Sequence, residues 1–136
     1  MNIYIASSFR NRHAVELLQD RLRGQGHTIL DWLRLAPPLP AGLRPDERRA
    51  ALDADERQEI FRFCAAACAR VDMVIYLGPS GQDAACEVGM AYAAGVPVAA
   101  LYSPLEAPGA MLAGCVTYEC SDYTALDAAI REVEEL

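Results

Sequence analysis

The chain has 136 residues, a net charge of −7 and a hydrophobic fraction of 53%, values that fit one globular domain spanning residues 1–136. They exclude a disordered chain, and no segment approaches the ~20 continuous apolar residues of a membrane span. The negative charge argues against a nucleic-acid polymer as partner but permits a small phosphorylated ligand. Without a signal-peptide pattern, and with five cysteines in no CxxC pair, we expect a cytoplasmic protein with neither metal nor cofactor.

The first elements form a β-α-β unit. Residues 2–6 are a compact block of β-formers and predict a buried strand. Apolar residues at helical spacing predict a helix over 11–23, and residues 28–33 predict a second strand. Such a unit favours a parallel sheet with a right-handed crossover.

A proline-rich stretch follows. Residues 35–49 contain four prolines, and we expect an irregular loop there that either closes over a site or covers the sheet edge. A helix is predicted over 53–70, because acids occupy its first turns and an apolar stripe follows.

The second half alternates in the same way. We expect strands at 72–77, 97–103 and 115–120, helices at 84–94 and 123–136, and a loop at 104–114, either without regular structure or with one helical turn. Together these elements predict a three-layer α/β sandwich with a five-stranded, mainly parallel sheet of flavodoxin-like or Rossmann-like topology. Ligands bind such sheets at the carboxyl ends of the strands, which directs attention to residues 6–11, 32–40 and 78–87.

Glu87 is the first candidate for chemistry. It lies at the start of the predicted helix 84–94, where the helix dipole can stabilise a carboxylate. Its neighbours are nearly all small and apolar, so we expect this helix to be buried almost all round. An ionised carboxylate there is costly unless it is paired or faces a pocket, and we interpret Glu87 as functional.

Two segments resemble the nucleoside 2-deoxyribosyltransferase superfamily. In "DMVIYLGPSGQDAACEVGMAYAAGVPV" an apolar strand precedes a polar loop, E-x-G-x-A and a Gly-x-Pro-Val turn, and "IYIASSFRNR" is similar to that superfamily's first strand and turn. The resemblance implies cleavage of the N-glycosidic bond of a nucleoside or nucleotide, by hydrolysis or deoxyribosyl transfer, in a homodimer or larger oligomer. It also implies roles for particular residues: Glu87 as nucleophile at C1′, Tyr4 orienting its carboxylate, Ser8 and Arg10 binding a 5′-phosphate, and Ser7, Gly78, Gly81 and Gly89 completing the substrate contacts.

The chain departs from the family pattern at two positions. Cys64 and Gly81 stand where the transferases carry acids, and Asp83 is the nearest remaining acid to Glu87. Asp83 can share one side of the helix with Glu87 as a second catalytic carboxylate, or cap the helix. The departures leave open a non-catalytic nucleotide-binding or sensor domain.

Several of these residues also fit ordinary structural roles. Trp32 can stack on a base or pack at the sheet edge. Ser8 fits a turn, Arg10 a solvated surface position and Tyr4 the core.

Overall fold

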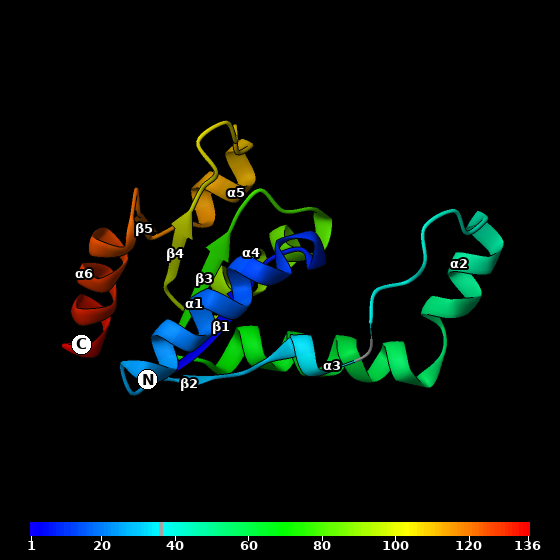
Figure 1. Ribbon diagram of the computed structural model, residues 1–136, viewed down its shortest axis with the longest axis horizontal. Helices are drawn as coiled ribbons and strands as arrows, with labels where there is room; N and C mark the ends of the chain where they lie inside the picture. Colours follow the sequence, from blue (N-terminus) through cyan, green and yellow to red (C-terminus); the bar gives the residue numbers. More distant parts are fainter. Residues whose placement is uncertain (36) are drawn as a thin grey trace.

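The computed structural model describes residues 1–35 and 37–136, and within them a five-stranded parallel sheet runs in the order β2-β1-β3-β4-β5. Figure 1 shows the sheet flanked by helices, with α3 reaching beyond it and α2 standing at the far end of α3. The strands are β1 (Asn2–Ala6), β2 (Thr28–Ile29), β3 (Met73–Leu77), β4 (Val98–Leu101) and β5 (Tyr118–Glu119). The helices are α1 (Arg12–Gly24), α2 (Pro45–Leu52), α3 (Asp55–Arg70), α4 (Gln82–Ala93), α5 (Ala110–Cys115) and α6 (Tyr123–Glu134).

The three central strands form the core. β1 pairs with β3 from Ile3 opposite Met73 to Ala6 opposite Tyr76, and β3 pairs in turn with β4. Side chains on both faces of these strands are buried, as expected for a parallel sheet covered by helices on each side. Their continuous apolar runs, rather than an alternating pattern, reflect this double burial.

The helices divide between the two faces because the strand order reverses after β2. Right-handed crossovers then place α1 on one face and α3 and α4, which pack together, on the other. An ion pair of 2.7 Å between Arg21 and Asp127 joins α1 to α6. The predicted three-layer α/β sandwich is confirmed, and the switch point between β1 and β3 is where the fold favours a ligand.

The second predicted strand is shorter than expected. The prediction of a strand over 28–33 is wrong beyond Ile29, because residues Trp32–Arg34 form a 3-10 helix. Asp31 caps this turn by accepting a hydrogen bond of 3.0 Å from the Leu33 amide. The cap competes with continued strand pairing at this edge of the sheet.

The prediction of an irregular loop over 35–49 is also wrong in part. The helix α2 begins at Pro45, in the first helical turn, where proline's missing N–H and fixed φ are tolerated. Residue 36 of that predicted loop lies outside the described residues. The helix predicted over 53–70 begins at Asp55, directly after α2. The C-terminal half of α3 packs against the sheet, whereas α2 and the N-terminal half of α3 project beyond it, and this projecting segment is called the arm here (Figure 1).

Three further predictions are corrected. The α4 helix buries one face only, and Cys86 and Tyr92 are exposed on the other, so the expectation of a helix buried nearly all round is wrong. Residues Ala110–Cys115 are helical, and β5 is limited to Tyr118–Glu119. None of the described helices combines the length and apolarity needed to cross a membrane.

Candidate active site

A cavity of about 780 Å³ lies between the arm and the carboxyl ends of β1 and β3. This volume falls in the range of small-molecule sites, and the position is the topological switch point of the sheet. The walls come from the turn after β1, the 3-10 helix at Trp32, the arm and the first turns of α4. The lining includes Ser7, Ser8, Phe9, Trp32, Arg48, Arg57, Cys64, Gly81, Asp83 and Glu87.

Glu87 lines this cavity from the second turn of α4. Burial raises the pKa of its carboxyl group to about 8, and the charge of Asp83 adds to the rise, while the neighbouring Tyr4 hydroxyl opposes it. A carboxyl group with a pKa this close to neutrality, facing a cavity, is the usual mark of a functional site.

Tyr4 lies on the central strand β1, close enough to Glu87 for each side chain to affect the pKa of the other. Its ring is fully buried, and among the described residues neither its hydroxyl oxygen nor Glu87 Oε2 has a hydrogen-bond partner. Burial and the charge of Glu87 both raise the pKa of Tyr4, so its hydroxyl stays protonated and remains a donor. Two buried, unpaired polar groups side by side carry a free-energy cost that structural side chains normally avoid.

Asp83 joins Glu87 at the cavity. The helix α4 begins at Gln82 with Gly81 as its N-cap, so Asp83 lies in the first turn and is not the capping residue. The i, i+4 spacing places both carboxylates on the cavity side of the helix. Cys64, which stands where an acid was expected, faces the same cavity from α3, and burial raises the pKa of its thiol to about 11.

A polar network ties the turn after β1 to the loop after β3. Ser7 Oγ donates to the Leu77 carbonyl at 2.7 Å, and the Ser8 amide donates to Ser80 Oγ at 3.0 Å. The Asn11 side chain donates to the Pro79 carbonyl at 2.7 Å. The sequence reasoning did not single out Ser80 or Asn11, although both lie in the stretches expected to hold the ligand.

Only some of the remaining predicted site residues line the cavity. Ser8 and Gly81 line the cavity, whereas Arg10 is exposed and lies outside its lining. Trp32 lines the cavity but is only 8% exposed; its indole donates to the Ile5 carbonyl at 2.6 Å, and its ring packs edge-on against Phe9. Little of that ring is free to stack on a base.

The glycines Gly78 and Gly89 also lie outside the cavity lining. Gly89 has open space around its Cα, whereas Gly78 faces the carboxylate of Glu106, which a Cβ would overlap. That carboxylate accepts hydrogen bonds from the Tyr76 hydroxyl and, at 3.0 Å, from the Ser103 amide. The Ser80 amide in turn donates to the Tyr76 hydroxyl at 3.3 Å, so Glu106 supports the loop that carries Ser80.

Replacing Gly78 by alanine is therefore expected to displace the Glu106 carboxylate from its two donors. We expect Gly78→Ala and Glu106→Ala each to lower the free energy of unfolding by about 1–2 kcal/mol, because Tyr76 and Ser103 lose an acceptor. Urea denaturation measures this loss, and Gly114→Ala, at a helical position with open space, serves as the control. Unchanged stability of both variants would show that the Glu106 contacts contribute nothing to the fold.

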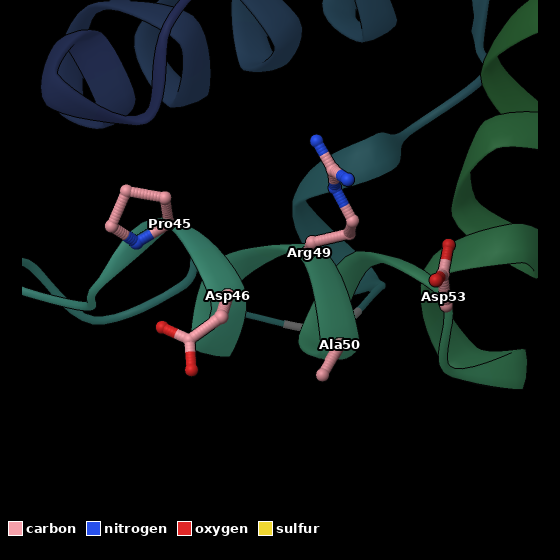
Figure 2. Close-up of a pocket in the computed structure, with 5 residues that line it drawn as sticks. All are labelled: Pro45, Asp46, Arg49, Ala50 and Asp53. Carbon is pink, nitrogen blue, oxygen red and sulfur yellow. The ribbon is translucent and has the colours of Figure 1, made fainter.

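A second hollow, of about 440 Å³, lies along α2 and is shown in Figure 2. Its walls are formed by Pro45, Asp46, Arg49, Ala50 and Asp53. It contains none of the residues that carry the predicted chemistry, so the cavity at Glu87 remains the candidate active site.

Three solved structures share this fold. A 2-deoxyribosyltransferase from Bacillus psychrosaccharolyticus matches with a TM-score of 0.72 and 20% identity, over 93% of this chain and 90% of that one. The CMP N-glycosidase of Clostridium botulinum matches with a TM-score of 0.62 and 14% identity, over 96% and 99% of the two chains. A conserved protein from Enterococcus faecalis V583 matches with a TM-score of 0.53 and 18% identity, over 93% of this chain and 84% of that one.

These similarities extend over nearly the whole chain, and at such low sequence identity they show a shared fold. No protein-family profile matches the sequence, and a comparison with curated proteins gives no match. Two of the three solved structures carry the names of activities that the sequence resemblance implied, and the fold expected from that resemblance is confirmed.

Proposed function

We propose that this protein cleaves the N-glycosidic bond of a nucleoside or nucleotide, with Glu87 as nucleophile. The observation that carries the proposal is the position of Glu87, which lines a ligand-sized cavity with its pKa raised to about 8 and a buried tyrosine hydroxyl beside it. Activities of this kind are named for two proteins that share the fold, which supports the same chemistry here.

The first chemical step forms a glycosyl-enzyme intermediate. Glu87, which holds a proton at neutral pH, passes that proton to Asp83, and its carboxylate oxygen attacks C1′ as the bond from C1′ to the base nitrogen breaks. The base leaves with that electron pair and takes the proton from Asp83. Positive charge develops on the sugar in this transition state, and the carboxylate offsets it before forming the covalent bond. Tyr4 keeps its proton and orients the carboxylate.

Hydrolysis completes the cycle. Water attacks C1′, the bond between C1′ and the Glu87 oxygen breaks with its electrons returning to the carboxylate, and Asp83 takes the proton from water. We favour hydrolysis over transfer because Cys64 and Gly81 replace the two acids of the transferases. Ser7 and Ser8 line the cavity and are fixed by hydrogen bonds with Ser80, which supports substrate contacts at these two residues.

The assembly state belongs to the same proposal. Phe61 on α3 and Tyr92 on α4 are 58% and 61% exposed, which supports a homodimer or larger oligomer that covers these side chains. Sedimentation velocity measures the mass directly, and a strictly monomeric, active protein would contradict this part of the proposal.

A substrate panel tests the function itself. The wild-type protein is incubated with common nucleosides and 5′-mononucleotides, in ribose and deoxyribose forms, and chromatography detects the free base. Release of one or more bases is the expected result. Nucleotides that raise the melting temperature without any release of base would instead favour a nucleotide-binding or sensor domain, the reading that Cys64 and Gly81 left open.

A further inference from the structure

The charged residues of the cavity separate into two ends. Among the described residues its lining contains four charged side chains: Asp83 and Glu87 on α4, and Arg48 and Arg57 on the arm. The sequence reasoning did not select either arginine. The cavity therefore has an acidic end at the proposed catalytic centre and a basic end at the arm.

The two arginines are not neutralised by carboxylates. None of the ion pairs found within residues 1–35 and 37–136 includes Arg48 or Arg57. Arg57 Nη2 donates to the Pro37 carbonyl at 2.6 Å, a contact that holds the side chain in place and leaves its charge unopposed. In a chain with a net charge of −7, two unpaired arginines in one cavity suit an anionic ligand.

Helix geometry gives the separation between the two ends. Arg57, Phe61 and Cys64 line the cavity at helical spacing along one side of α3. Seven residues separate Arg57 from Cys64, which is about 10 Å along the helix axis at 1.5 Å per residue. Cys64 lies close enough to Glu87 for the carboxylate charge to raise the pKa of the thiol, so Arg57 is about two turns from the catalytic end.

We propose that Arg48 and Arg57 bind the phosphate of the substrate, and that the protein acts on a nucleotide rather than on a free nucleoside. This inference rests on the proposed function for the placement of the sugar at Glu87. A phosphate beside Asp83 and Glu87 is repelled by the Asp83 carboxylate, and by Glu87 once it ionises, whereas the arm offers guanidinium groups that bind phosphate oxygens in pairs. The proposed phosphate site therefore differs from the one that the family resemblance implied at Arg10, a residue that lies outside the cavity lining.

Calorimetric binding tests the proposal in a Glu87→Gln background, where base release does not interfere. The ligands are the four 2′-deoxynucleoside 5′-monophosphates and the matching nucleosides. We expect at least one nucleotide to bind more tightly than its nucleoside. Arg48→Gln and Arg57→Gln should each raise the Kd of that nucleotide about tenfold, the size of one charge-assisted contact, and leave the nucleoside unaffected.

Two controls bracket this experiment. Arg49→Gln changes a neighbouring exposed arginine of α2 that lines the other hollow, and should leave nucleotide binding unchanged (Figure 2). Arg10→Gln tests the position that the family resemblance implied. Equal affinities for nucleotides and nucleosides, or loss of the difference in Arg10→Gln but not in the arm variants, would overturn the proposal.

Failure of the proposed function gives a different result. A wild-type protein that releases no base, while its nucleotide binding still depends on Arg48 and Arg57, would support the phosphate site and overturn the cleavage step alone. Base release that is equally fast from nucleosides and nucleotides, and insensitive to both arm variants, would support cleavage and overturn the phosphate site.

Discussion

Replacing Glu87 by alanine is expected to slow base release by at least about 10³-fold, the scale of losing a catalytic nucleophile. The carboxylate both offsets charge on the sugar and forms the covalent intermediate, and Asp83, one helical turn before Glu87, is assigned the proton transfers instead. Initial rates of base release, measured at equal protein concentration by chromatography, give the comparison.

A matched control separates this effect from a loss of surface charge. Glu59→Gln removes a carboxylate from an exposed position of α3 that does not line the cavity, and its rate should equal that of the wild type. A Glu87→Ala protein that remained folded and released base at the wild-type rate would eliminate Glu87 as the nucleophile.

The same residue is expected to lower stability at neutral and alkaline pH. The pKa of Glu87 is raised from 4.5 to about 8 in the folded protein, so between these values the unfolded chain is ionised while the folded chain keeps its proton. Stability is therefore fully retained below about pH 4.5 and falls as the pH rises to about 8. Glu87→Gln, which cannot ionise, should unfold with a free energy about 4 kcal/mol higher than wild type at pH 8 and nearly equal at pH 4.

Urea denaturation at several pH values measures this difference. Asp83→Asn is an informative companion, because Asp83 charge contributes to the raised pKa of Glu87 and its removal should shift the pH dependence downward. A constant difference between Glu87→Gln and wild type from pH 4 to pH 8 would show that Glu87 ionises normally. We expect Glu87→Gln to be more stable than the wild type but inactive, because the buried carboxyl group that lowers stability is the one proposed to act in catalysis.

Local sequence pattern was sufficient for the central architecture. The apolar runs of β1 and β3 and the helical stripe of α3 predicted these elements, because double burial and helical periodicity act over a few neighbouring residues. The order of elements then predicted the sheet type, since strands that alternate with helices are joined by crossovers and run parallel. The same reasoning placed Glu87 and Asp83 together, because residues four apart share one side of a helix.

Local sequence pattern did not predict which side chains surround Glu87 in the folded protein. The α2 helix was missed because prolines dominate the stretch around it, and α4 was expected to be buried because its side chains are small, although one face has no covering element. Arg48, Arg57, Ser80 and Glu106 reach their places through packing between segments far apart in the chain.

The sequence by itself thus determined the layers of this protein and singled out Glu87, which the structure places in the lining of the cavity. Only the tertiary structure decided that the arm gives the cavity a basic end, because the relative position of α2, α3 and the sheet depends on long-range contacts rather than on local propensity.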